Sequence, residues 1–563
     1  MPTDTSSIIE TRGHQMFPRL EASEIDRLRR FGETRHYAAN EPVFKVGEVA
    51  PGLVVIVKGK IKVTHRQTWH SSAHITLHEP GSFMGELAQL AARPALVDSH
   101  AEEPVEALVI APDRLRALFI AEAELGERIM RALILRRMGL LEDGTGGPVI
   151  IGTASNGDVL RLEVFLRRNS HPHQQLDPEI DTEAKALIER FHVDPGQLPI
   201  VLCPGGELLH NPTETQLARC IGLLRPLDPD RVYDVAVVGA GPAGLATAVY
   251  AGSEGLSVLM LDCRSFGGQA GASARIENYL GFPTGISGIA LMARAYNQAQ
   301  KFGVEVAIPT EAISLAQAGA GAANGDLTLN LQERQSVVAR SVVIATGARY
   351  RRPALDNLDA FEATSVHYWA SSLEVKLCAS QEVALVGGGN SAGQAAVYLA
   401  SKASKVWVLV RGPGLTAMSQ YLVDRLTSIG NIEVVTNTHV TALEGSGGML
   451  TAIRWQQTGT AEETRKEIKH LFLFIGADPN TDWLAGSDVA LDAKGFVKTG
   501  SDLGNGRHAL ETSRDRVFAI GDVRSASTKR VAAAVGEGAQ VVAAIHGVLA
   551  GFGETVHRPA RSG

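Results

Sequence analysis

The sequence has few cysteines and few aromatic residues, and it lacks a long apolar run. Only four cysteines occur in 563 residues, at Cys203, Cys220, Cys263 and Cys378. No two of them have CxxC spacing, so neither a disulfide framework nor a zinc-type ligand pair is indicated. No apolar stretch approaches the roughly 18 residues of a membrane span, and the N-terminus lacks the basic and apolar regions of a secretion signal. We therefore expect a cytoplasmic protein without a membrane span.

The chain also lacks a large excess of either charge. Its 54 Lys and Arg residues against 61 Asp and Glu residues give a formal net charge of −7. This balance leaves no basic footprint for nucleic acid, and we expect no nucleic-acid partner. The length exceeds what one hydrophobic core usually serves, so we expect several domains.

Hydrophobic patterns divide the chain into the parts of a multidomain α/β protein. Residues 1–143 carry short β-branched runs broken by glycine and then a helical pattern, which predicts a β-roll capped by helices. Residues 148–226 predict a small α/β unit. The rest alternates apolar strands with helices around two glycine-rich turns, which predicts two Rossmann-like lobes. The first lobe comprises residues 231–354 and 480–555, and residues 355–479 form a second lobe inserted in it.

The first glycine-rich turn lies in YDVAVVGAGPAGLATAVYAGSEGLSVLMLD. Gly239, Gly241 and Gly244 have GxGxxG spacing between an apolar strand and a helix, with Pro242 and Ala243 inside the turn. The glycines permit a tight turn, close approach of a pyrophosphate and packing of helix on strand. Asp262, about 20 residues further on, is placed to accept from a ribose hydroxyl. These residues predict a dinucleotide-binding site.

The second turn, in QEVALVGGGNSAGQAAVYLASKASKVWVLVR, repeats the arrangement. It consists of Gly387, Gly389, Asn390, Ser391 and Ala392. Here Arg411 occupies the position of the acid, and an arginine pairs with a 2′-phosphate rather than accepting from a hydroxyl. The second lobe is therefore predicted to bind NADPH, with NADH as the alternative.

Six further motifs, in the same order, make the C-terminal part resemble low-molecular-weight thioredoxin reductases. They are GGQ at 267–269, IENYLGFP at 276–283, ATGA at 345–348, FLFIGADPN at 472–480, FAIGDVR at 518–524 and KRVAAAVGEG at 529–538. The resemblance implies FAD in the first lobe, NADPH in the second, and a homodimer. By position it assigns cofactor contacts to Gly268, Gln269, Asn278, Ala345, Thr346, Gly347, Gly521, Asp522, Arg530, Val531 and Ala532.

The sequence departs from this family at its redox dithiol. The family has a CxxC shortly before the second turn, where this chain has Ala370, Ser371 and Ser372, and we interpret the nearby Cys378 as core packing. Serine cannot exchange a disulfide. We therefore expect an FAD-dependent NAD(P)H oxidoreductase with an unknown electron acceptor, and we assign no catalytic side chain. Two alternatives remain: a redox- or cyclic-nucleotide-responsive sensor with little turnover, or a thioredoxin-disulfide reductase that uses thiols in trans.

The segment PGSFMGELAQLAARPALV resembles the phosphate-binding cassette of cyclic nucleotide-binding domains. The resemblance implies that Gly85 and Glu86 hold a ribose. The cassette arginine is replaced by Ala95 in an ungapped alignment, whereas a second alignment offers Arg93. The effector is then a cyclic nucleotide or a related small molecule.

Residues 148–226 resemble a thioredoxin or glutaredoxin fold. We expect RLEVFLRR to be a strand, DTEAKALIERF a helix and LPIVLCPGGELL a hairpin-like pair, with RNSHPH as the active-site turn. Pro199 matches the cis-proline of that fold, and the turn has no cysteine, so the unit is predicted to be degenerate. His171 and His173 are expected to face solvent in this loop.

Overall fold

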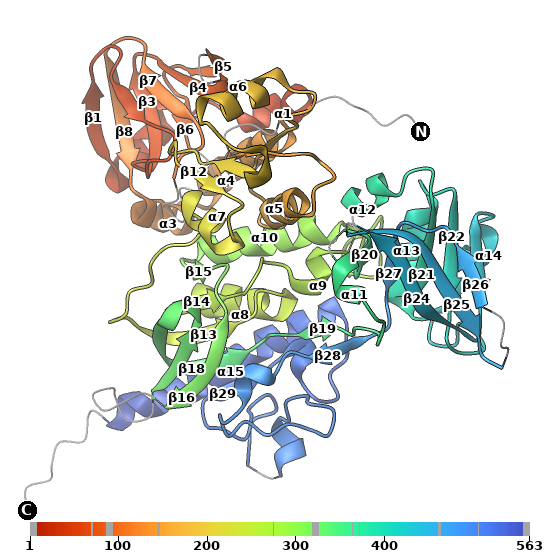
Figure 1. Ribbon diagram of the computed structural model, residues 1–563. Coiled ribbons are helices and arrows are strands. Elements are labelled where there is room, and N and C mark those ends of the chain that lie inside the picture. The colour runs from red at the N-terminus through yellow and green to blue at the C-terminus, as the bar shows by residue number, and fades with distance from the viewer. Residues whose placement is uncertain are drawn as a thin grey trace, which may run out of the picture.

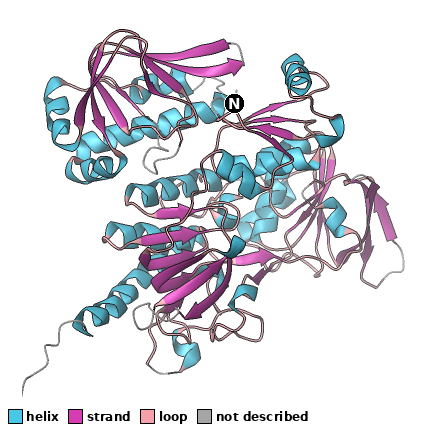
Figure 2. Cartoon of the chain, turned by 60° about the vertical axis from the view of Figure 1, so that its left-hand side comes forward, coloured by secondary structure: helices cyan, strands magenta, loops and turns pink. Residues whose placement is uncertain are grey.

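The computed structural model arranges the chain as four packed parts (Figure 1). It describes residues 8–68, 71–85, 94–143, 147–273, 275–317, 326–362, 364–370, 372–446, 448–459, 463–504 and 506–555. The first unit, in red and orange, and the second unit, in yellow, lie next to each other above the green and blue first lobe. Figure 2 shows that helices separate the sheets of these parts.

The first unit confirms the predicted β-roll. Two four-stranded antiparallel sheets, ordered β1-β8-β3-β6 and β2-β7-β4-β5, face each other across apolar side chains such as those of Val54 and Ile56. Helices α3 and α4 cap the roll, and α1 packs along α4. The elements are α1 (Ile8–Met16), α2 (Ala22–Leu28), β1 (Glu33–Tyr37), β2 (Pro42–Phe44), β3 (Leu53–Lys58), β4 (Ile61–Thr68), β5 (Ser71–His78), β6 (Phe83–Met84), β7 (Asp98–Ala101), β8 (Val105–Ile110), α3 (Pro112–Ala121) and α4 (Ala123–Asp143).

The second unit has one four-stranded sheet, ordered β10-β9-β11-β12. Strands β9 and β10 are parallel, and β11 pairs antiparallel with β9 and β12. The predicted hairpin-like pair and the predicted helix are both present. The elements are β9 (Val149–Ile151), α5 (Gly157–Arg168), β10 (Gln174–Leu176), α6 (Thr182–Arg190), β11 (Ile200–Leu202), β12 (Leu208–His210) and α7 (Glu214–Cys220).

The prediction of a strand at RLEVFLRR is wrong, because this segment is the second half of α5. Its apolar residues bury one helical face, and the side chain of Asn156 caps the helix by accepting from the amides of Asp158 and Val159. The loop that joins the first strand to the first helix is therefore 152–156, and not the predicted RNSHPH turn. Pro199 follows a cis peptide bond, as predicted, and a Cβ added at Gly152 would lie 3.2 Å from its Cβ.

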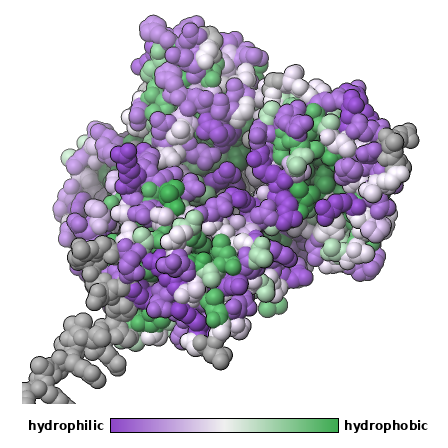
Figure 3. Space-filling view, turned by 60° about the horizontal axis from the view of Figure 1, so that its bottom comes forward, coloured by the Kyte–Doolittle hydropathy of each residue, from purple (hydrophilic) through white to green (hydrophobic). Residues whose placement is uncertain are grey.

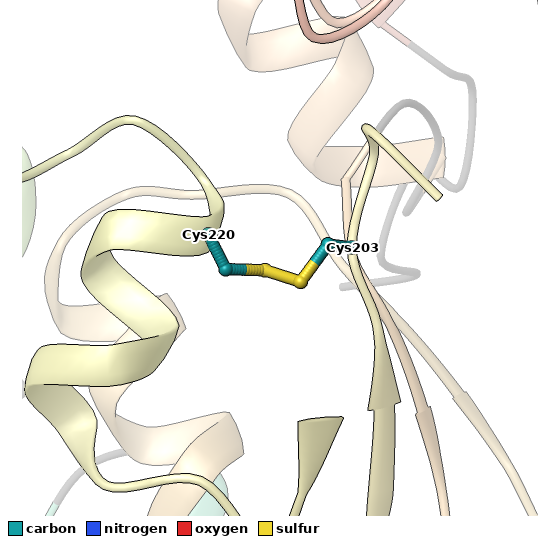
Figure 4. The surroundings of a disulfide bond; sticks show 2 residues. All are labelled: Cys203 and Cys220. Atoms are coloured by element: carbon teal, nitrogen blue, oxygen red, sulfur yellow. A yellow bond between two sulfur atoms is a disulfide. The ribbon is translucent and has the colours of Figure 1, made fainter. Parts of the chain in front are cut away.

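Two further predictions for this unit are wrong. His171 is buried, at 4% exposure, and His173 is half-buried with Nε2 3.7 Å from Glu163. Cys203 and Cys220 form a disulfide bond between the end of β11 and the end of α7 (Figure 4). Their separation of 17 positions in the sequence matches no cysteine motif, so only the tertiary fold brings the two thiols together.

The first lobe is built on a seven-stranded sheet whose strands come from both sides of the inserted lobe. Its order is β15-β14-β13-β18-β17-β16, and β29 pairs in parallel with residues 342–344 of β18, beyond the part of β18 that pairs with β17. Helices α8, α10 and α15 pack on one face. The elements are β13 (Val232–Val238), α8 (Pro242–Ser253), β14 (Val258–Leu261), α9 (Gly268–Gly271), α10 (Gly288–Lys301), β15 (Glu305–Ala307), β16 (Ala312–Gln317), β17 (Leu327–Leu331), β18 (Ser336–Ile344), β29 (Val517–Ala519) and α15 (Val531–Thr555).

The second lobe has a parallel five-stranded sheet, ordered β20-β27-β21-β22-β23, and a three-stranded antiparallel sheet, β24-β25-β26. The antiparallel pair β19 and β28 joins it to the first lobe. The elements are β19 (Ala348–Tyr350), α11 (Leu358–Phe361), β20 (Val366–His367), α12 (Ser372–Leu377), β21 (Glu382–Val386), α13 (Asn390–Ala400), β22 (Lys405–Leu409), α14 (Gln420–Ser428), β23 (Ile432–Val435), β24 (Thr438–Ser446), β25 (Met449–Gln457), β26 (Glu463–Lys466), β27 (Leu471–Leu473) and β28 (Ala477–Pro479).

Within the described part of the chain, one helix has the length and composition of a membrane span. It is Val531–Ala550 of α15, with a mean hydropathy of 1.4. The helix packs along α8, and Val541, Val542 and Ile545 are buried against the core of the first lobe. On the face seen in Figure 3, hydrophobic residues occur in separate patches among hydrophilic ones. Only 28% of this stretch is buried, so α15 packs one side on the first lobe while its other residues are half-buried or exposed.

Candidate functional site

The first glycine turn has the backbone geometry that its sequence predicts. Gly239 ends β13 with φ +113°, and a Cβ added there would lie 2.3 Å from the carbonyl oxygen of Ala345. A Cβ on Gly244 would lie 1.8 Å from the carbonyl oxygen of Gly239, so the helix can approach the strand only with glycine at this position. Gly241 is the N-cap of α8, with Pro242 and Ala243 as the first helical residues. The turn therefore presents a helix N-terminus at the carboxyl edge of the sheet.

The GGQ motif lies directly against this turn. The amide of Gly267 donates to the carbonyl oxygen of Ala240 at 2.7 Å. A Cβ on Gly268 would lie 3.0 Å from the Cα of Gly241, whereas one on Gly241 would meet only the Cα of Gly268, at 3.9 Å. Two backbones thus line the space before α8 without side chains, as a pyrophosphate requires. The side-chain amide of Gln269 donates to the carbonyl oxygen of Ala348.

Asp262 is anchored beside the same turn. Its Oδ2 accepts from the amide of Ala240 at 2.9 Å, and its Oδ1 accepts from the amides of Arg264 and Ser265. Because a carboxylate offers about four lone-pair sites, it can still accept from a ribose hydroxyl. Asp262 therefore follows the end of β14, as predicted, and it also holds the first glycine turn through its hydrogen bond with Ala240.

The C-terminal motifs return to this edge of the sheet. Gly521 has φ +71°, and a Cβ there would lie 3.0 Å from the Cβ of Ala243, which places the following Asp522 next to the first turn. Burial raises the pKa of Asp522 above its ordinary value, with Lys529 opposing this effect. Such a desolvated carboxyl favours a hydrogen-bonding partner such as a sugar hydroxyl.

The remaining predicted contacts of the first lobe lie around the same edge. Val531 begins α15, and Arg530 immediately precedes it. The amide of Ala345 donates to the carbonyl oxygen of Val238, and the hydroxyl of Thr346 donates to that of Asn480. The side chains of Asn278 and Arg530 are exposed to solvent. The other predicted residues, Gly347 and Ala532, are neighbours of these in the chain.

The second turn has the same construction. Gly387 has φ +150°, and a Cβ there would lie 2.6 Å from the carbonyl oxygen of Phe474. Gly389 caps α13 and has open space where a Cβ would lie. The first turn of α13 contains Asn390, Ser391 and the buried Ala392. Arg411 is exposed two residues beyond the end of β22, as the predicted phosphate contact requires.

The segment that replaces the redox dithiol is flanked by the buried residues Ala370 and Glu374. Ala370 is buried, Ser372 begins α12, and Ser371 lies outside the described residues. Cys378 follows α12 with no exposed surface, and burial together with Glu374 raises the pKa of its thiol to about 12. A thiol that stays protonated and inaccessible cannot act as a nucleophile. Within the described parts of the chain, no group of His, Cys, Asp and Glu is placed to hold a metal ion.

A residue that the sequence did not indicate connects three parts of the molecule. Arg168, at the end of α5, donates through Nη2 to the carbonyl oxygen of Gly268 at 3.1 Å. Its guanidinium carbon lies 5.6 Å from the ring centroid of Trp369 in the second lobe. The ring of Tyr350 lies beside those of Tyr368 and Trp369. No local pattern could reveal this contact, because its partners are 100 and 201 positions away in the chain.

The cassette of the first unit is only partly described. Gly85 has φ +145°, whereas the predicted contacts Glu86 and Arg93 lie outside the described residues. Arg136 of α4 is buried and donates to the carbonyl oxygens of Gly85 and Met16, both at 3.0 Å. Burial lowers the pKa of Arg136 to about 9. Arg136 therefore connects α4 with Gly85 of the cassette segment, and α4 is the helix that leads to the second unit.

Two glycine turns on two nested sheets define a reductase that binds a flavin dinucleotide and a nicotinamide dinucleotide. Residues 233–538, more than half of the chain, match the model of the pyridine nucleotide-disulphide oxidoreductase family, and the chain belongs to that family. Residues 34–122 match the cyclic nucleotide-binding domain model. The family match confirms an FAD-dependent NAD(P)H oxidoreductase of the thioredoxin reductase-like type, and thioredoxin reductases use FAD and NADPH.

Individual relatives agree with this assignment. The chain is 34% identical over 313 residues to the NADPH-dependent thioredoxin reductase 3 of Arabidopsis thaliana, which is 54% of this chain and 56% of that protein. It therefore spans about half the length of that relative. It is 31% identical over 316 residues to a thioredoxin reductase of Mycoplasmopsis pulmonis, covering 55% of this chain and 96% of that protein. The thioredoxin reductase structure of T. acidophilum aligns with a TM-score of 0.51 and 27% identity, over 56% and 99% of the two chains.

Proposed function

We propose that this protein oxidises NADPH and reduces an external acceptor directly at its flavin, without an internal dithiol. The observation that supports the proposal is that Ser372, and not a cysteine, begins α12 where the family's CxxC lies, while the nearest thiol, that of Cys378, is buried. A serine in place of a cysteine cannot form the disulfide that would receive electrons. The bound FAD would supply the site that accepts a hydride and gives up electrons.

The residues of the first lobe have separate tasks in holding FAD. Gly239, Gly241 and Gly244 would admit the pyrophosphate to the start of α8, where the backbone amides and the helix dipole favour negative charge. Asp262 would accept from the adenosine ribose and Asp522 from the ribityl chain. The first turn of α15, from Arg530 to Ala532, would lie against the flavin ring.

The second lobe would hold NADPH at the start of α13. Gly387, Gly389 and Ala392 would admit its pyrophosphate, and Asn390 and Ser391 offer amides in the first helical turn. Arg411 is exposed at the position from which a guanidinium can pair with a 2′-phosphate. NADH lacks that phosphate, so we propose NADPH as the preferred donor.

The acceptor is expected to reach the flavin from outside. A quinone, oxygen, a ferredoxin-like carrier or an external disulfide would satisfy this chemistry. The second unit, which resembles a thioredoxin fold, has no cysteine in the 152–156 loop beside cis-Pro199, so it cannot pass electrons through a dithiol there. The first unit would bind a cyclic nucleotide or a related effector, and we expect a cytoplasmic homodimer that binds no nucleic acid.

Steady-state turnover distinguishes this proposal from its two alternatives. The purified holoprotein is mixed with NADPH and, in turn, a soluble quinone, oxygen, a ferredoxin and thioredoxin disulfide. Continuous NADPH consumption with one of the non-thiol acceptors is the expected result. Flavin reduction without turnover for all of them would indicate a sensor. Turnover restricted to thioredoxin disulfide, and dependent on added small thiols, would indicate thiols acting in trans.

A further inference from the structure

The disulfide of the second unit joins the end of β11 to the end of α7. Cys203 directly follows β11, and Cys220 is the last residue of α7, with Cα atoms 5.7 Å apart (Figure 4). Cys203 is buried, whereas Cys220 is half-buried. Disulfides in reducing compartments are usually transient, catalytic or redox-sensing, and we expect this protein to be cytoplasmic.

Each cysteine is followed two residues later by a glycine that touches the first unit. A Cβ added at Gly47 would lie 3.3 Å from the Cα of Gly205. A Cβ added at Gly222 would lie 2.3 Å from the ring of Pro94, and Gly222 has φ +66°. A larger residue at Gly222 would clash with the ring of Pro94, and one at Gly47 would press against the backbone of Gly205. The disulfide therefore constrains the spacing of two of the points at which the second unit meets the first.

Both contact points belong to one small bridge in the first unit. The amide of Gly47 donates to the carbonyl oxygen of Ala95 at 2.9 Å, and the amide of Ala95 donates to that of Glu48 at 2.8 Å. Val46 pairs with Ala95, and Val49 pairs with Pro94. We call residues 46–49 and 94–95 the flank bridge, because residues 94–95 belong to the C-terminal end of the cassette segment. Gly205 lies against Gly47 in one segment of the flank bridge, and Gly222 lies against Pro94 in the other.

We propose that Cys203 and Cys220 form a reversible thiol–disulfide switch that sets how firmly the flank bridge is held. An external dithiol would attack Sγ of the more exposed Cys220, forming a mixed disulfide and releasing Cys203 as a thiol. Its second thiol would then displace Cys220. The S–S bond is broken, Cys203 and Cys220 together take up two electrons and two protons, and the dithiol becomes a disulfide. The switch depends on the contact between the two units and not on the flavin chemistry.

The rest of the second unit can keep its fold when the bond is broken. The turn after β11 retains hydrogen bonds from the amide of Cys203 to Glu207 and from the amide of Gly206 to Cys203. Leu217 and Ala218 of α7 have no exposed surface and belong to the core with Val201. Reduction should therefore free the end of α7, and with it the Gly222–Pro94 contact, without unfolding the sheet.

Hydrogen exchange on the full-length holoprotein tests this switch. The protein is treated with dithiothreitol under native conditions, and thiol alkylation followed by mass measurement counts the exposed cysteines. We expect two additional alkylated thiols and, on the order of tenfold, faster exchange at the amides of Gly47 and Ala95. The double variant C203S/C220S should exchange like the reduced protein, and C263S, which alters the exposed free cysteine, should behave like wild type.

The amide of Val201 in β11 serves as the internal reference. Its exchange should stay slow in every form, because β11 is a central strand of the sheet. Three results would overturn the proposal: the disulfide resists dithiothreitol in the folded protein, both thiols appear but exchange at Gly47 and Ala95 does not change, or Val201 loses its protection together with them. The last result would make the bond a structural staple for the whole unit.

Discussion

Arg168 donates a hydrogen bond to the carbonyl oxygen of Gly268 while its guanidinium lies over the ring of Trp369. The second unit thereby touches the flavin-side turn of the first lobe and the segment that enters the second lobe. At its other end, α5 also meets the second lobe, since a Cβ on Gly157 would lie 3.3 Å from the side chain of Thr364. Helix α5 therefore spans the boundary between the two lobes.

The R168A variant should weaken the contacts that hold α5 against both lobes, and it should keep its FAD. Losing a charged donor and a ring contact removes interactions worth roughly 1 to 3 kcal/mol at a half-buried site. We expect an altered rate of flavin reduction by NADPH, by about threefold or more, with unchanged FAD content, measured by stopped-flow absorbance. The R167A variant is the matched control, because Arg167 is the neighbour of Arg168 and its ion pair, among the described residues, is with Glu163 of its own helix. Equal rates for wild type and R168A would contradict this role for α5.

Substitutions in the two glycine turns should affect the two cofactors separately. In G241A the new methyl group has space in the protein but would occupy the room left for a pyrophosphate. The variant should fold and lose most of its FAD, measured by flavin absorbance per protein. In G389A, where a Cβ meets nothing within 4 Å, FAD should remain and reduction by NADPH should fail. Retention of FAD in G241A would argue against the first site.

The preference for NADPH should depend on Arg411. Replacing an exposed guanidinium that pairs with a phosphate costs up to about 1.5 to 3 kcal/mol, and less where solvent screens it. For R411S we expect the KM for NADPH to rise by about threefold to tenfold while the KM for NADH stays the same. The R425S variant, which removes an exposed arginine paired with Glu277 at 3.3 Å, controls for a general loss of positive charge. An equal rise for both donors in R411S would contradict the 2′-phosphate contact.

Buried histidines should make the fold sensitive to acid. Burial lowers the pKa of His78 and of His367 to about 3 and that of His470 to about 4, with Arg136, the neighbouring histidine and Lys469 as further causes. Because their pKa in the unfolded chain is about 6.5, they stabilise the fold fully above pH 6.5. This contribution falls as the pH drops from about 6.5 toward 4, since only the unfolded chain then takes up their protons.

Urea unfolding between pH 7.5 and pH 5 measures this effect. Well below pH 6.5, each histidine should contribute a slope of about 1.4 kcal/mol per pH unit. In the variant H78N, the slope for the first unit should decrease by about one proton, with the second lobe unaffected. Equal stability of wild type at both ends of this pH range would show that the three histidines take up protons in the folded state.

The sequence predicted the sites better than it predicted the second unit. Gly239 to Gly244 and Gly387 to Ala392 could be placed because strand, turn and helix are consecutive in the chain, so local periodicity defines them. In RLEVFLRR the same apolar residues fit a short strand or a helix, and the cap at Asn156 decides between them. The Cys203–Cys220 bond and the Arg168 contact depend on tertiary packing between distant segments, which no local pattern encodes.

The central claim is that electrons leave the flavin without passing through a protein thiol. It is tested most directly with the double variant C263S/C378S, which removes both free cysteines and leaves the disulfide of the second unit intact. Under anaerobic conditions, this variant is titrated with NADPH while the flavin absorbance is followed, and then reoxidised with a soluble quinone. We expect NADPH to bleach the flavin of the variant, and the quinone to reoxidise it, at the wild-type rates. Loss of reoxidation in the variant, with bleaching preserved, would contradict the central claim.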